Sequence, residues 1–145
     1  MTLRTILFAI VAVVTFAACD SGGSGELCLS VTPNESYTLS GAATTMNFAP
    51  ATKTYTVQNT CGSQLTLSVE EDVRWLDVEI DAFGSSESGS LGAGASIDVD
   101  VEVVYGDDNS ERLDQLAAGS YSAEIRFEDD TNGSSVTRSV NLTVL

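Results

Sequence analysis

Hydrophobic and polar residues alternate along most of the chain from residue 26 onwards. The clearest example is SIDVDVEVVY (96–105), in which apolar and acidic residues take turns. The same period of two recurs in KTYTVQ (53–58), LTLSVE (65–70) and YSAEIRFE (121–128). This period is typical of strands with one face buried and one face in water. The residues predicted to face the core are Ile97, Val99, Val101, Val103, Tyr55, Val57, Leu65, Leu67, Val69, Tyr121, Ala123, Ile125 and Phe127.

The last predicted strand, SVTRSVNLTVL (135–145), places an arginine in its hydrophobic row. Arg138 shares a face with Val136, Val140, Leu142 and Val144. A buried unpaired arginine is costly, so we expect Arg138 near the strand end or at a bulge, with its guanidinium paired to a carboxylate. The preceding Asn132-Gly133 pair signals a hairpin because both residues accept positive φ, which predicts that the last two strands are antiparallel.

Turn-forming stretches separate these segments, and we find no convincing amphipathic helix. Together with LCLSV (27–31) and RWLDVEI (74–80), the chain holds seven to eight short strands at a spacing typical of a sandwich. The predicted fold class is all-β, an immunoglobulin-like antiparallel β-sandwich of seven to eight strands. A small barrel is the alternative.

A short apolar run precedes the alternating region. It covers residues 6–14, too short to cross a membrane but suited to the centre of a secretory signal. The next residues, Phe16-Ala17-Ala18-Cys19, resemble the lipobox of bacterial lipoproteins, although Phe16 stands where an aliphatic residue is usual; ordinary cleavage after Ala17 is the alternative. The resemblance implies a lipoprotein signal peptide at 1–18, a lipidated Cys19 with a Gly/Ser-rich tether at 19–27, and a domain at 28–145.

Three cysteines are an odd number for an exported protein. Assigning Cys19 to lipid leaves Cys28 and Cys61, which we expect to form one disulfide in an oxidising compartment. Two unpaired buried thiols are the alternative.

The chain carries 21 acidic and 6 basic side chains, a formal net charge of −15. Such a surface repels the phosphates of nucleic acids and the head groups of anionic lipids. We therefore expect no nucleic-acid partner, and membrane contact through the lipid on Cys19 alone.

The strand segments also resemble a known family in their order and spacing. Six segments follow one another as in BACON-like domains, immunoglobulin-like modules of bacterial exported proteins: LSVTP (29–33), KTYTVQNTCGSQLTLSV (53–69), RWLDV (74–78), GSLGAGASIDVDV (89–101), LAAGSYSAEIRF (116–127) and TNGSSVTRSVNLTV (131–144). The resemblance implies a BACON-like domain at 28–145 that acts as a non-catalytic accessory module, of a kind sometimes proposed to bind carbohydrate or mucin. Cys28 and Cys61 are additions to the family pattern.

Catalytic chemistry is poorly represented. The absence of histidine from the sequence removes the usual general base and the commonest zinc ligand, so we expect no enzyme and no required cofactor. Calcium is the one metal worth considering, because hard oxygen ligands cluster in two turns. The candidates are Asp107, Asp108, Asn109 and Glu111 in one loop, and Glu128, Asp129, Asp130 and Asn132 in the hairpin. Acidic turns that merely face solvent are the alternative.

A sugar site requires exposed aromatic side chains, for which Trp75 and Phe83 are the candidates. Core packing of Trp75 and capping of the sandwich by Phe83 are the alternatives. The function we expect is a lipid-anchored, non-catalytic module of the bacterial cell envelope, periplasmic or surface-facing, for adhesion, scaffolding or binding of an envelope protein. The alternative is a carbohydrate-binding module that holds glycan near the cell.

Overall fold

The computed structural model describes residues 26–42, 47–84, 86–104 and 116–145. The predicted signal peptide, Cys19 and most of the tether lie outside these residues, as do the calcium candidates Asp107, Asp108, Asn109 and Glu111. Within the described ranges, no helix is both long enough and apolar enough to span a membrane.

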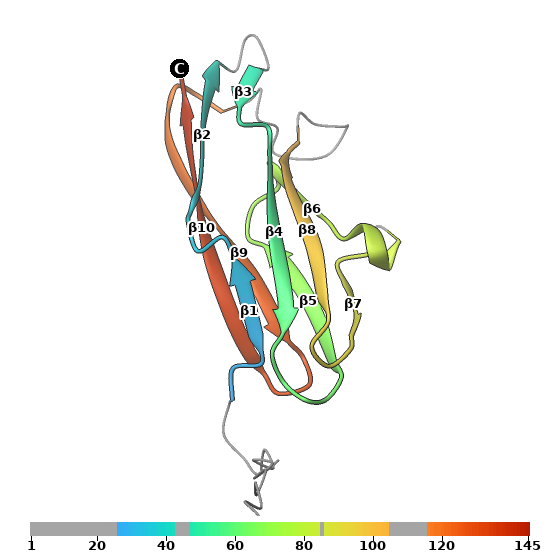
Figure 1. Cartoon of the computed structure of the whole chain (residues 1–145). Helices are drawn as coiled ribbons and strands as arrows, with labels where there is room; N and C mark the ends of the chain where they lie inside the picture. The colour runs from blue at the N-terminus through green and yellow to red at the C-terminus, as the bar shows by residue number, and fades with distance from the viewer. Residues whose placement is uncertain (1–25, 43–46, 85, 105–115) are drawn as a thin grey trace, which may run out of the picture.

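Ten strands in the described part of the chain form two sheets that face each other, as Figure 1 shows. The four-stranded sheet has the order β1 (Leu29–Thr32), β4 (Thr52–Asn59), β8 (Ser96–Val103), β6 (Leu76–Glu79). The six-stranded sheet has the order β3 (Asn47–Ala49), β2 (Tyr37–Ala42), β10 (Ser134–Val144), β9 (Gly119–Asp129), β5 (Leu65–Glu71), β7 (Ser88–Leu91). A short 3₁₀ helix, η2 (Asp81–Phe83), connects β6 to β7.

The predicted sandwich is confirmed, and the structure adds strands that the sequence pattern did not reveal. β2, β3 and β7 are short strands at or near the edges of the six-stranded sheet. One of them also departs from the predicted antiparallel arrangement, because β2 pairs with β10 in parallel, Val140 opposite Tyr37.

The core lies between the sheets and contains the residues that the alternation predicted. All thirteen except Tyr121, which is half-buried, have at most 9% of their surface exposed. The rings of Tyr55 on β4 and Phe127 on β9 meet edge to face, with centroids 5.6 Å apart, and so join the two sheets. Burial of each large apolar side chain contributes about 1.5–3 kcal/mol, which makes this interface the main source of stability.

β9 and β10 form the antiparallel hairpin that Asn132-Gly133 predicted, with eleven pairs from Ser134–Asp129 to Val144–Gly119. The turn depends on Asp129, which is fully buried. Its Oδ1 accepts the backbone N–H of Thr131 at 2.9 Å and its Oδ2 accepts the side-chain amide of Asn132 at 2.7 Å. Gly133 takes φ of 68°, a conformation that only glycine adopts readily.

Arg138 lies in the middle of β10, in regular register opposite Ile125, and not at a strand end or bulge as expected. Among the described residues no carboxylate pairs with it; it binds backbone carbonyl oxygens on both sides of the sandwich instead. Its guanidinium donates to Thr137 O at 2.9 Å on β10, and across the sandwich to Val31 O at 2.5 Å and Pro33 O at 3.3 Å. Five N–H donors in a rigid fork allow arginine to serve several acceptors at once. Arg138 therefore closes the side of the sandwich where the chain passes from β1 to β2.

We predict that Arg138→Met lowers the free energy of unfolding by about 2–4 kcal/mol, because three carbonyl oxygens lose their charged donor. Arg138→Lys also destabilises, since one ammonium group does not reproduce the planar fork. Urea unfolding followed by circular dichroism measures both effects.

Arg126→Met is the matched control. Arg126 lies on the outer face of β9 with half of its side chain exposed, and its ion pair with Glu128 measures 2.9 Å. Exposed pairs contribute little, so this variant stays within about 1 kcal/mol of wild type. Equal losses for the two arginines would contradict the role of Arg138.

Candidate functional site

The predicted disulfide is present: Cys28 and Cys61 are bonded, with Cα atoms 5.1 Å apart. It lies at the pole where the described chain enters β1, beside the β9–β10 turn, since Asn132 Nδ2 lies 3.6 Å from Cys28 Sγ. A crosslink over 33 residues restricts the unfolded chain and by the loop-entropy model contributes up to about 4 kcal/mol. The disulfide at this end of the sandwich therefore stabilises the domain.

A fully buried asparagine organises the same pole. The side-chain amide of Asn59 donates to the carbonyl oxygens of Ser63 at 2.8 Å, Leu91 at 3.1 Å and Gly92 at 3.1 Å, and its Oδ1 accepts the Cys61 N–H at 2.9 Å. Asn59 was not among the residues predicted from the sequence, although it continues the inward row of Tyr55 and Val57. A polar residue in an apolar row is the signal that could have revealed it.

The two aromatic candidates for sugar binding do not present exposed platforms. Trp75 is 4% exposed and belongs to the core. Phe83 is half-buried and packs against the core from η2. Its ring covers Gly89 on β7: a Cβ on Gly89 would stand 2.5 Å from Phe83 Cγ. Phe83 therefore covers the side of the sandwich between β6 and β7.

We predict that Gly89→Ala destabilises the domain by about 1–3 kcal/mol, the usual effect of forcing extra volume into a packed site. The same substitution in a Phe83→Ala background is much less damaging, because the ring that meets the new methyl group is gone. A thermal double-mutant cycle measures the coupling. Additive effects would show that Phe83 and Gly89 do not pack together.

The outer face of the four-stranded sheet is acidic. Asp77 and Glu79 on β6 stand opposite Glu102 and Asp100 on β8. Neighbouring threonines on β4 engage part of this charge: Thr54 donates to Asp100 at 2.6 Å and Thr56 to Asp98 at 2.7 Å. Even so, no group of three metal-ligating side chains with suitable geometry occurs among residues 26–42, 47–84, 86–104 and 116–145.

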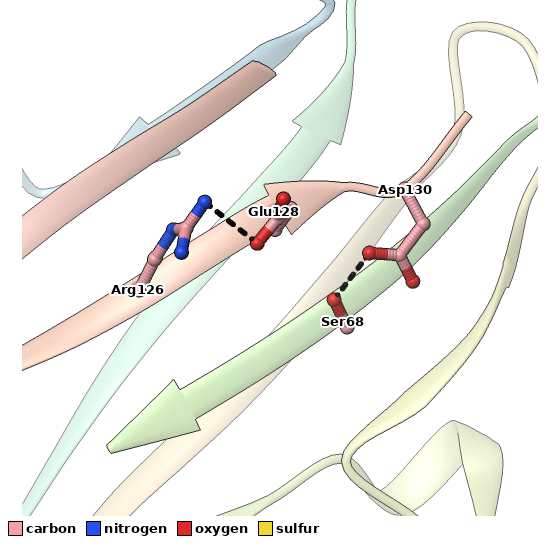
Figure 2. Close-up of polar contacts among 4 residues, drawn as sticks. All are labelled: Ser68, Arg126, Glu128 and Asp130. Atoms are coloured by element: carbon pink, nitrogen blue, oxygen red, sulfur yellow. Dashed lines mark hydrogen bonds and ion pairs between the residues drawn. The ribbon is translucent and has the colours of Figure 1, made fainter. Parts of the chain in front are cut away.

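The second calcium candidate, in the β9–β10 hairpin, uses its polar groups internally. Asp129 holds the turn, as described above, and Asp130 accepts a hydrogen bond from Ser68 at 2.8 Å. Figure 2 shows this contact beside the Arg126–Glu128 ion pair on the same face. The carboxylates of the hairpin thus bind groups of the protein.

A hollow of about 400 Å³ opens on the outer face of the six-stranded sheet, over β9 and β10. Two cross-strand pairs form its floor: Ser122 stands opposite Asn141, and Glu124 opposite Ser139. Asp72, just beyond the end of β5, completes the lining together with Ala123. The sequence alone does not predict this site, because only the pairing register shows which outward-facing residues lie beside one another.

The hollow adjoins an open stretch of strand edge. β5 pairs with β9 only from Asp129 to Ile125. At Asp72 the chain leaves this sheet for β6, and Asp72 ends the ladder: its Oδ1 accepts the Glu124 N–H at 2.9 Å and its own N–H donates to Glu124 O at 3.4 Å. The first part of β9, from Gly119 to Ala123, has no neighbour on that side among the described residues.

Glu71, the last residue of β5, is a carboxylate in an inward row. Its Oε2 is buried without a hydrogen-bond partner among the described residues. Desolvation by burial raises the pKa of Glu71, and the nearby charges of Glu87, Asp77 and Glu70 raise it further. A backbone hydrogen bond opposes these effects in part.

A carboxyl whose folded pKa lies above its unfolded value favours the folded state at low pH and loses that contribution as the pH rises through the folded pKa. We therefore predict that Glu71→Gln raises the urea midpoint at neutral pH, and that the gain shrinks as the pH falls towards about 4.5. Glu35→Gln, at an exposed turn position, is the control. A gain for Glu71→Gln that does not depend on pH would contradict this explanation.

Comparison with known proteins finds no matching family model and no matching curated protein. Solved structures do match. The PapD-like domain 7 of human CEP192 has a TM-score of 0.51 at 8% identity, over 91% of this chain and 95% of that one. A chain of the Salmonella enterica SafA pilin–SafB chaperone complex has a TM-score of 0.50 at 8% identity, over 84% of this chain and 57% of that one.

A family 123 glycoside hydrolase from Clostridium perfringens also matches, with a TM-score of 0.51 at 10% identity, over 65% of this chain and 21% of the enzyme. At such identities the likeness shows the fold alone. The chain is an immunoglobulin-like, PapD-like β-sandwich. Consistent with this class, the Tyr121 hydroxyl donates to Ala117 O at 2.9 Å, near the start of β9, as in the tyrosine corner of such sandwiches.

Proposed function

We propose that this protein is a lipid-anchored, non-catalytic module of the bacterial cell envelope that binds a partner protein. The observation that carries the proposal is the position of the hollow and the open edge of β9 relative to the chain entry. The entry and the disulfide share one pole, where β10 begins at Ser134. Asn141 lies seven residues further along β10, roughly 23 Å away at the rise of a strand. A tether on Cys19 would thus leave the site free to meet a partner.

Several features support binding without catalysis. The sequence contains no histidine, and the polar groups buried in the described core, Asn59 and Asp129, are engaged in holding turns. The structure of the Salmonella enterica SafA pilin in complex with the SafB chaperone contains a chain that shares the fold. That complex is a precedent for protein binding by such a sandwich. The disulfide and the BACON-like order of segments agree with an exported accessory module.

Carbohydrate binding is the second candidate, and the lining of the hollow favours it. Ser122, Ser139 and Asn141 offer hydroxyl and amide groups, and Asp72 and Glu124 offer carboxylates, which are groups that bind sugar hydroxyls. Because Trp75 is buried and Phe83 covers Gly89, such a site would have to bind glycan without either ring.

One preparation of the protein, extracted from membranes with detergent, tests both parts of the proposal. The expected intact mass begins at Cys19 and carries acyl chains, whereas Cys19→Ser yields unacylated protein that is released from the membrane. The same material, crosslinked in the envelope, is expected to yield a discrete protein adduct. Isothermal titration against polysaccharides tests the second candidate.

A mature chain without acyl mass on Cys19 would overturn the anchor. Saturable polysaccharide binding that Asn141→Ala abolishes, with the fold intact and no protein adduct formed, would replace protein binding by the carbohydrate function.

A further inference from the structure

We propose that the open edge of β9, residues Gly119–Ala123, binds an extended segment of the partner protein by strand addition, with a lysine or arginine of that segment placed at Asp72 and Glu124. The inference rests on the proposed protein-binding function and names the surface and the chemistry of the partner. An added strand gains affinity from main-chain hydrogen bonds and specificity from alternate side chains.

Along β9, every second residue directs its backbone N–H and carbonyl towards the β5 side, and these are the groups that an added strand could bind. Glu124 directs its N–H and carbonyl towards the β5 side, where Asp72 meets both. Because successive residues of a strand alternate in direction, Ser122 and Ser120 direct their N–H and carbonyl groups to the same side. Both residues are exposed, and β5 has already left the sheet at this level. An extended segment in line with β5 would therefore meet four backbone groups that no described residue binds.

Side chains of the protein cover parts of three other sheet edges, those of β1, β7 and β6. On β1, the carbonyl oxygen of Val31 already accepts a hydrogen bond from the Arg138 guanidinium. On β7, Ser86 Oγ accepts the Ser88 N–H at 3.4 Å and donates to Ser88 O at 3.1 Å. On β6, Leu76 and Val78 are 3% and 5% exposed, so that little of this edge is accessible. Proteins commonly protect edge strands in such ways, whereas the β5-facing side of β9 at Gly119–Ala123 has no such cover among the described residues.

The negative charge of Asp72 and Glu124 favours a basic segment of another protein as the binding partner at this edge. Asp72 uses Oδ1 to accept the Glu124 N–H, and no described residue binds its Oδ2. Glu124 is exposed beside it, and the chain carries a net charge of −15. A second copy pairing here would bring its own Asp72 and Glu124 close to these carboxylates, and like charges oppose that contact. A basic segment of another protein relieves the repulsion instead.

A random decapeptide library displayed on phage is the probe, selected against the full-length protein in detergent. We expect enriched peptides with alternating β-forming residues and at least one lysine or arginine. Bound peptide should slow hydrogen exchange at the amides of Ser120 and Ser122. Ser122→Pro, which removes an N–H that faces away from the β10 ladder and is therefore tolerated in the fold, should weaken binding at least about tenfold.

Asp72→Asn is the second variant, because it keeps the oxygen that accepts the Glu124 N–H and removes the charge. It should weaken binding of the basic peptides by about tenfold. Asp98→Asn, on the opposite face of the sandwich, is the control and should leave binding unchanged.

The inference is overturned if no peptide is enriched, if enriched peptides lack basic residues, or if both variants bind as wild type does. Concentration-dependent dimerisation that Ser122→Pro abolishes would assign the edge to a second copy. A polysaccharide that protects the Ser122 amide would assign it to glycan. A crosslinked envelope partner that persists in Ser122→Pro would leave the proposed function standing and remove this surface from it.

Discussion

The register between β9 and β10 is the constraint on which the rest of the structure depends. Their eleven pairs place Ala123, Ile125 and Phe127 in the core beside Val140 and Leu142. A slip of one residue would turn these side chains to solvent. The same register sets the outer face, where Ser122 meets Asn141 and Glu124 meets Ser139. The β9–β10 register thus determines both the core on the inner face and the candidate site on the outer face, and the buried carboxylate of Asp129 fixes that register at the turn.

The chain also passes repeatedly from one sheet to the other, and three of these crossings differ in how the neighbouring sheet edge is covered. Between β1 and β2 the guanidinium of Arg138 joins carbonyl oxygens of both sheets. Between β6 and β7 the ring of Phe83 covers Gly89. Between β5 and β6, Asp72 ends the ladder, and beyond it no described strand pairs with this edge of β9. A single side chain covers the first two of these crossings, Arg138 in one case and Phe83 in the other. The hollow lies at the third crossing, between β5 and β6.

The sequence predicts much of the fold, because a period of two determines which side chains face each other across the sandwich. It failed where a partner lies far away in the chain. β2 has few apolar residues and depends on parallel pairing with β10, about one hundred residues later. Arg138 was expected to need a carboxylate, yet the edge of β1 supplies carbonyl oxygens that local sequence does not reveal. The disulfide was accessible to reasoning because only two cysteines remained after Cys19.

The end of β5 shows why a binding surface is physically reasonable at this place. Glu71 keeps a buried, unpaired carboxylate oxygen in an inward row, and Asp72 directly follows it with a carboxylate that is only partly used. Successive residues of a strand face opposite sides of the sheet, so the two carboxylates act in different places. Glu71 raises the energy of the folded state from inside the sandwich, near Glu87, Asp77 and Glu70, whereas Asp72 and Glu124 leave a negative potential on the outer face beside the edge of β9. A cationic side chain arriving with an extended segment would neutralise the charge on the outer face and leave the buried Glu71 as it is.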